Sequence, residues 1–211
     1  MVATWWCWTR VLLETLDVIY ERVTWICGGS ELPAEEIAKM TKMKMTDLFL
    51  EELKAEAVGT RRALEQVPEG LNDWRPHPKS MPLGYLASLV ATMPRWIDFM
   101  INQDELDFAP VGGNPNKPAE LRTNAKLVAA LDESVEKARV ALEGTTDEHL
   151  MTLWKLKAGG YLVSEEPRYK NIRSGVFNHL AHHRGQLTVY LRLNEAMVPA
   201  LYGPSADDRG F

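Results

Sequence analysis

The sequence predicts an all-α fold, a bundle of four helices with a short β-hairpin before the last helix. Apolar residues recur at helical spacing in four separate stretches, which indicates four amphipathic helices. The connections between these stretches are long and contain seven of the twelve prolines. The last stretch also holds three of the five histidines within five residues, His179, His182 and His183. In four-helix bundles, metal sites are built from inward side chains on facing helices.

The first two helices are predicted from their starts and their apolar faces. Helix one runs from about Thr46 to Gln66, because Thr46 and Asp47 suit a helix start. Its inward positions are Phe49, Leu53, Ala57 and Leu64. Ser80 is the predicted N-cap of helix two, which has proline in its first turn and runs to about Asn102. Its apolar face is formed by Leu86, Leu89, Val90, Met93, Ile97 and Met100.

A predicted long loop, from Asp104 to Pro118, separates helix two from helix three. The loop carries three prolines and two glycines, which disfavour regular structure. Helix three is predicted from about Ala119 to Leu142, with an inward face of Leu127, Leu131, Val135 and Val140. Between Leu150 and Val163, two short apolar runs flank a Gly-Gly pair, which favours a hairpin.

The last predicted helix runs from Ile172 to Asn194, and Pro199 follows its end. At about 100° per residue, His179 and His183 share one arc with the apolar positions Ile172, Val176, Leu187 and Tyr190. Both imidazoles are therefore expected to point into the protein, with His182 on the flank. Two imidazoles one turn apart can chelate one metal ion. The alternative is a helix that simply buries one histidine and exposes two. Gly185 inside this helix predicts the close approach of a neighbouring segment.

Four segments together resemble the DinB/YfiT-like superfamily of metal-binding four-helix bundles. They read NHLAHHRGQLTVYLRLNEAMVPALYGPSADD (178–208), LNDWRPHPKSM (71–81), DELDFAP (104–110) and DEHLMTLWKLKAGG (147–160). The resemblance covers most of the chain and implies an up-down-down-up bundle, often a homodimer. It also implies three histidines that hold a divalent metal (nickel, zinc or iron) and leave positions open for water or substrate. Members include transferases and isomerases that use low-molecular-weight thiols, and hydrolases.

Two of the three implied ligands carry over onto His179 and His183. The third falls in the segment MPLGYLASLVATMPRW (81–96), at Leu89, whose side chain cannot coordinate a metal. His77 is interpreted as a residue of the loop before helix two, because the resemblance places a histidine there in addition to the three ligands. His149, near the end of the third connection, could approach the site only if that connection folds over the bundle. His182 and Gln186 share the helix of the pair and cannot easily close the site from the opposite side.

The resemblance thus leaves two functions open. One is a metal-dependent enzyme, of thiol-dependent transferase or hydrolase type, whose histidine triad is incomplete. The other is a non-catalytic, stress-associated homodimeric bundle, in which the two histidines bond to water or to each other and Leu89 packs against them. The sequence assigns no catalytic residue and no organic cofactor to either function.

Composition and charge narrow the partners and the compartment. The net charge is -5 and no basic patch stands out, so nucleic-acid binding is not expected. Both cysteines precede residue 43, which fits a reducing cytoplasm. Residues 1–42 hold four of the seven tryptophans but no uncharged run long enough to span a membrane. We interpret 1–42 as an extension, either an extra helix or a start site placed too early, and 43–211 as the DinB-like domain.

Overall fold

The computed structural model describes residues 43–113 and 121–210. The chain divides into two compact units, Met1–Met43 and Lys44–Phe211, and the second unit holds the bundle. The sequence predictions for residues 1–42 and for the helix start at Ala119 lie outside the described residues.

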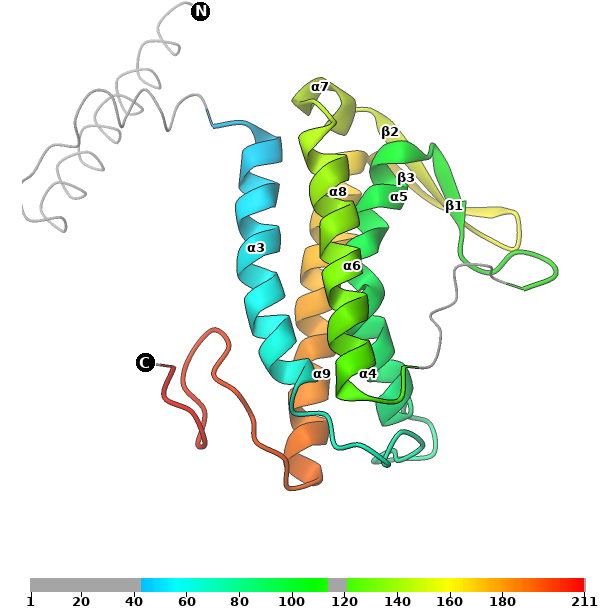
Figure 1. Cartoon of the computed structure of the whole chain (residues 1–211). Coiled ribbons are helices and arrows are strands. Elements are labelled where there is room, and N and C mark those ends of the chain that lie inside the picture. Colours follow the sequence, from blue (N-terminus) through cyan, green and yellow to red (C-terminus); the bar gives the residue numbers. More distant parts are fainter. Residues whose placement is uncertain (1–42, 114–120, 211) are drawn as a thin grey trace, which may run out of the picture. The chain divides into compact units, whose positions relative to one another are not determined.

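Four long helical segments form the bundle, as predicted (Figure 1). The first is α3 (Met45–Leu64), and the second joins α4 (Leu83–Thr92), the 3₁₀ turn η1 (Met93–Arg95) and α5 (Trp96–Asn102). The third is α6 (Asn124–Glu143), followed by the short helix α7 (Asp147–Leu150). The last joins α8 (Arg168–Asn171), the π-helical segment η2 (Ile172–Asn178) and α9 (His179–Leu193).

Contacts at the helix ends fix the directions of the four segments. Asn124 at the start of α6 donates its side-chain amide to the Glu65 carbonyl, just past the end of α3 (2.9 Å). Tyr190 near the end of α9 donates its hydroxyl to the carbonyl of Met81, which precedes α4 (3.2 Å). Figure 1 shows α4 and α6 beginning at the same end of the bundle. The first and last segments therefore run one way and the middle two the other, as the resemblance implied.

The all-α prediction is wrong in one respect, because the described residues include a three-stranded mixed sheet. The predicted hairpin is present as β2 (Leu153–Ala158) and β3 (Tyr161–Pro167), which pair antiparallel. A third strand, β1 (Glu105–Asp107), pairs parallel with β2 inside the segment predicted as a loop. Three residues show no readable alternation, and the partner strand is remote in sequence, so β1 left no local signal.

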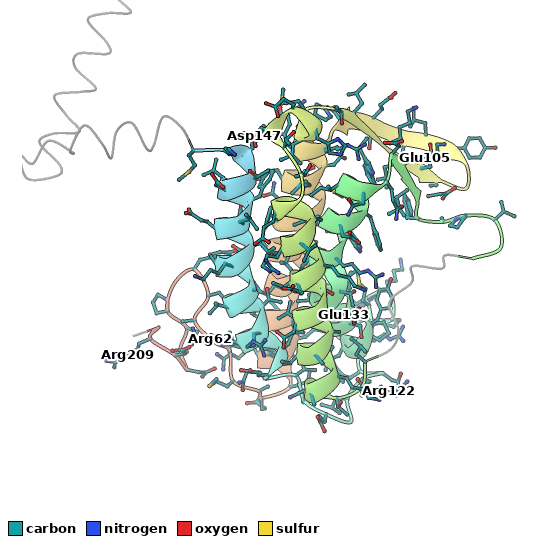
Figure 2. The ribbon with its side chains drawn as sticks, turned by 45° about the horizontal axis from the view of Figure 1, so that its top comes forward. Arg62, Glu105, Arg122, Glu133, Asp147 and Arg209 are labelled. Carbon is teal, nitrogen blue, oxygen red and sulfur yellow. The ribbon has the colours of Figure 1, made fainter. Side chains whose placement is uncertain are left out.

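Side chains from other elements complete the ends of these segments. The Asp147 carboxylate accepts hydrogen bonds from the backbone N–H groups of Met45 (2.9 Å) and Thr46 (3.2 Å), and so caps α3 (Figure 2). The Asp107 carboxylate accepts from the N–H groups of Gly159 (2.9 Å) and Gly160 (2.6 Å), and so holds the hairpin turn against β1. Both contacts join segments that are distant in sequence.

Two helices depart from their predicted course. Pro94 has no backbone N–H, and the second segment changes there from α-helix to the 3₁₀ turn η1. Val140 was predicted to face inward but is 54% exposed, while Ala141 and Leu142 are buried instead. Of the remaining predicted positions of the third helix, Leu127 and Leu131 are buried in the core and Val135 is partly buried. Among the helices of the described residues, none is both long and apolar enough to cross a membrane.

Candidate metal centre

The histidine pair follows directly on the π-helical segment η2, which changes the hydrogen-bonding register of the helix. The backbone N–H of His179 donates to the Val176 carbonyl, three residues earlier. The Gly175 carbonyl, four residues earlier, instead accepts a hydrogen bond from the His179 ring. A Cβ at Gly175 would lie 3.2 Å from the Met100 methyl group, so glycine permits the close packing of η2 on α5. Single π-helical turns are frequent at functional sites.

The face predicted to point inward does so. Its four apolar positions, Ile172, Val176, Leu187 and Tyr190, are all buried. The His183 side chain is buried with them, at 5% exposure. His179 is half-buried and His182 is exposed on the flank, so the helical phase read from the sequence is confirmed.

The two inward rings meet through their Nε2 atoms. His183 Nε2 and His179 Nε2 are 2.9 Å apart, and the ring centroids are 4.5 Å apart. Gln186 donates its amide N–H to His182 Nε2 (3.1 Å), which turns its Oε1 toward His183 Nδ1 (2.8 Å). The Oε1 atom can only accept, so His183 Nδ1 carries the hydrogen. The His179 ring bonds to the Gly175 backbone, and its Nε2 faces His183, so we assign the hydrogen of His179 to Nδ1.

This arrangement leaves two unprotonated Nε2 atoms facing each other. Two neutral rings in this tautomer would direct their lone pairs at each other across 2.9 Å, which is repulsive. A cation between the two nitrogens, either a proton or a metal ion, removes the repulsion. Metal–imidazole bonds are about 2.0–2.1 Å long. With one ion bound by both nitrogens at this separation, the nitrogen–metal–nitrogen angle would be about 90°. The spacing therefore fits a single chelated ion.

Burial keeps both rings in the neutral form that can bind a metal. The pKa values of His179 and His183 are lowered, mainly because burial disfavours the charged imidazolium. The Gly175 and Gln186 hydrogen bonds oppose this effect in part, and the neighbouring His182 adds to it. Metal ligands must be deprotonated, so a lowered pKa extends binding to more acidic solution.

The second helical segment covers the pair from the opposite side. The Trp96 ring lies 5.7 Å from the His179 ring, and Tyr190 contacts Met81 fifteen residues earlier on the same segment. Leu89 lies between Met81 and Trp96, within the stretch of this segment that faces α9 from Tyr190 to His179, and it is buried at 7% exposure. The position implied for a third ligand is therefore inward but apolar.

The other histidines lie elsewhere. His77 is exposed in its loop, where its Nδ1 accepts from the backbone N–H of Lys79 (3.1 Å). His149 Nε2 bonds to the Ile101 carbonyl at the end of α5 (2.9 Å). Within residues 43–113 and 121–210, no group of three or more His, Cys, Asp or Glu side chains is placed to hold a metal ion.

A buried arginine next to the pair anchors α9 to α3. Arg184 pairs with the Glu56 carboxylate (2.6 Å) and donates to the Thr60 hydroxyl (3.0 Å). It also donates to the hydroxyl of Tyr202 in the C-terminal segment. Sequence reasoning missed Glu56, which reads as an ordinary surface glutamate. Nothing approaches within 4 Å of a Cβ at Gly185, so the expected close approach there is wrong.

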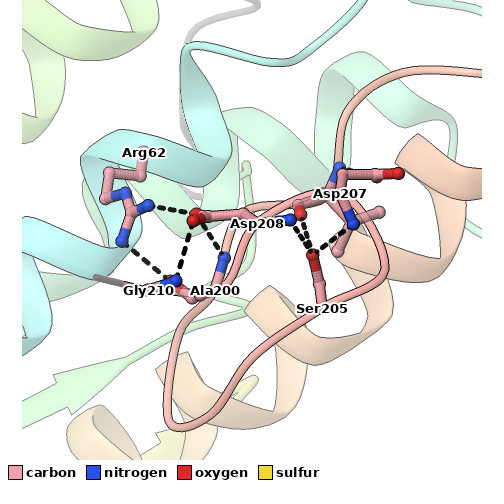
Figure 3. A network of polar contacts seen from close by, with 7 residues as sticks. Arg62, Ala200, Ser205, Asp207, Asp208 and Gly210 are labelled. Atoms are coloured by element: carbon pink, nitrogen blue, oxygen red, sulfur yellow. Dashed lines mark hydrogen bonds and ion pairs between the residues drawn. The ribbon is translucent and has the colours of Figure 1, made fainter.

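The C-terminal segment is also fixed to α3, by the carboxylate of Asp208 (Figure 3). Asp208 pairs with Arg62 of α3 and accepts from the backbone N–H groups of Ala200 (2.8 Å) and Gly210 (2.9 Å). The Ser205 hydroxyl accepts from the Asp208 N–H (3.0 Å). The segment after α9 is thus tied to α3 near Arg62 and, through Tyr202, near Glu56.

Comparison with known proteins identifies the fold. No family model matches the chain, and no curated protein matches it. Its structure is similar to a DinB-like protein from Bacillus cereus, with a TM-score of 0.56 and 20% identity over 73% of this chain and 95% of that one. It is also similar to a DinB-like protein from Bacillus subtilis, with a TM-score of 0.53 and 21% identity over 76% of this chain and 98% of that one. The chain has a DinB-like fold.

Proposed function

We propose that His179 and His183 form a two-histidine site for a divalent metal ion (nickel, zinc or iron) in a DinB-like, metal-dependent enzyme. One observation carries the proposal: the two Nε2 atoms face each other 2.9 Å apart, and Gln186 Oε1 holds His183 Nδ1 on the other side of its ring. The likeness to DinB-like proteins supports the fold in which such a site is expected. The proposed reaction class is transfer to or from a low-molecular-weight thiol, or hydrolysis, in a homodimer.

The chain's own residues have distinct parts in this proposal. His179 and His183 hold the ion, while Gln186 and the Gly175 carbonyl fix the tautomer that presents both Nε2 lone pairs. A bound divalent metal would lower the pKa of a coordinated thiol or water and so supply a nucleophile. Trp96 shields the His179 ring on one side. Leu89 supplies no ligand, so more coordination positions stay open than in a three-histidine site, and weaker binding is expected.

A second function is favoured by Leu89. In a non-catalytic homodimeric bundle, the same two rings would be neutral and would bond to water or to each other, and apolar packing by Leu89 would suffice. The lack of a third metal-binding side chain among the described residues agrees with this alternative. The two functions differ in whether the His179–His183 pair takes up a metal ion.

Metal titration of untagged protein tests the proposal. We expect nickel or zinc to bind at one equivalent per chain in calorimetry, and His183→Ala to weaken that binding at least tenfold. His77→Ala is the control, because His77 is exposed in the loop before α4. Equal affinities in the parent and the His183→Ala variant would refute the metal site and favour the non-catalytic bundle. Thiol-transfer and hydrolysis assays follow only if metal binds.

A further inference from the structure

A groove of about 530 Å³ runs between α3 and α6, on residues that do not include the histidine pair. Its floor is apolar and comes from both helices: Leu53, Ala57, Leu131 and Val135. Val58 stands at its rim with 60% of its surface exposed. Volumes of this order are typical of small-molecule sites, and apolar linings with a few polar groups are their usual composition.

The antiparallel helices bring two cations to the same level of this groove. Arg61 of α3 forms an ion pair with Asp132 of α6, which fixes the level of the two helices at one end. Counting seven residues back along α3 reaches Lys54, and seven forward along α6 reaches Arg139. Both residues line the groove. Because the helices rise equally per residue, Lys54 and Arg139 face the groove from opposite walls at one level.

The carboxylates of the rim are already paired. Asp132 binds Arg61, and Glu143 binds Arg139 (2.5 Å), which Glu136 also binds. Lys54 is exposed and forms no ion pair with any residue of 43–113 or 121–210. The groove therefore presents an apolar floor with one uncommitted positive charge, beside an arginine held in place.

We propose that this groove binds a medium-chain carboxylate. The carboxylate lies at Lys54 beside Arg139, and the acyl chain runs over Ala57 and Val58 toward the Arg61–Asp132 ion pair. The seven residues between these levels rise about 10 Å along α3, a length that the chain of octanoate spans. The ion pair closes the far end and limits the length of the chain. A cationic head group would meet the unpaired charge of Lys54 instead.

Calorimetric titration of the full chain with octanoate tests the proposal. We expect saturable binding at one site, with octanol and octylamine, which carry the same chain, binding at least tenfold more weakly. Lys54→Glu reverses the charge at an exposed position and is expected to weaken octanoate binding about tenfold or more. Lys54→Arg is expected to retain it. Val58→Trp fills the groove and is expected to abolish it.

The matched control is Lys126→Glu, which changes the net charge equally at an exposed lysine of α6 that does not line the groove. We expect octanoate affinity to stay within about twofold of the parent in this variant. Equal binding of octanoate and octanol, or equal losses in Lys54→Glu and Lys126→Glu, would overturn the proposal. A lack of saturable octanoate binding would also overturn the proposal. If the parent is in addition a dimer that Val58→Trp dissociates, the groove is an interface between two copies of the chain.

Discussion

Replacing Leu89 by histidine tests whether the His179–His183 pair lacks only its third ligand. Leu89 is buried on the segment that faces the pair, between Met81 and Trp96, so we expect an imidazole there to reach the ion from the opposite side. We expect Leu89→His to bind nickel or zinc at least tenfold more tightly than the parent. A third imidazole adds one bond and fixes the geometry of the other two.

The same exchange has a cost in the absence of metal. It removes a leucine that is 7% exposed and buries a polar ring, so we expect the free energy of unfolding to fall by about 3 kcal/mol. For a chain of this size, the melting temperature would fall by about 9 °C. Metal at about one hundred times its dissociation constant would restore about 2.7 kcal/mol. Calorimetry measures the affinity, and thermal unfolding with and without metal measures both stability effects.

Val90→His is the matched control for this experiment. Val90 is buried on the same helix but points about 100° away from Leu89, so its histidine should destabilise the protein without improving metal affinity. Equal affinities in the parent and Leu89→His would refute the reasoning, since either another group completes the site or Leu89 does not face the pair. A crystal structure with metal separates these two explanations. An equal gain in metal affinity in Val90→His would refute the orientation assigned to Leu89 about the helix axis.

Three further predictions concern the groups around the pair. Gln186→Leu removes the acceptor of His183 Nδ1, and we expect metal affinity measured by calorimetry to fall about tenfold. Burial lowers the folded-state pKa of His179, so on acidification the unfolded state takes up a proton on this residue before the folded state does. The free energy of unfolding is therefore highest above about pH 6.5 and falls as the pH decreases. We expect the melting temperature of His179→Gln to depend less on pH than that of the parent. Glu56→Ala leaves Arg184 buried without its carboxylate and should cost about 3–5 kcal/mol in urea unfolding, whereas an unchanged midpoint would show that the pair contributes nothing.

The fold could be predicted from the sequence where the signal was local. The arc shared by His183 and Leu187 follows from helical periodicity, and the hairpin turn at Gly159 follows from turn chemistry. Strand β1 could not be predicted, because its pairing with β2 depends on contacts between distant segments. The exposure of Val140 has the same origin. Periodicity fixes the apolar stripe only to within a fraction of a turn, and packing against neighbouring helices decides its edge.

The site divides in the same way. The spacing of His179 and His183 predicts that the rings can meet, but not the tautomer in which they do so. That depends on the π-helical segment, which frees the Gly175 carbonyl, and on Gln186, whose amide is oriented by His182. A π-helical turn has no reliable sequence signal, because it arises where packing of one segment conflicts with regular α-helical register. The ion pair of Arg184 with Glu56 could not be predicted either, because it depends on how α9 packs against α3.

The positions of Gly175 and Gln186 in the sequence explain how the two imidazoles can keep their orientation although Leu89 offers no ligand. Gly175 and Gln186 lie in η2 and α9 themselves, one turn before His179 and one turn after His183, so one helical segment supplies both ligands and both of their supports. The facing segment, with Leu89 and Trp96, contributes shielding and a position for a further ligand. Loss of a ligand on that segment lowers affinity but leaves the orientation of the two imidazoles unchanged. In the proposed site, the arrangement of the pair therefore depends on residues 175–186, and the residue at position 89 is expected to set the metal affinity.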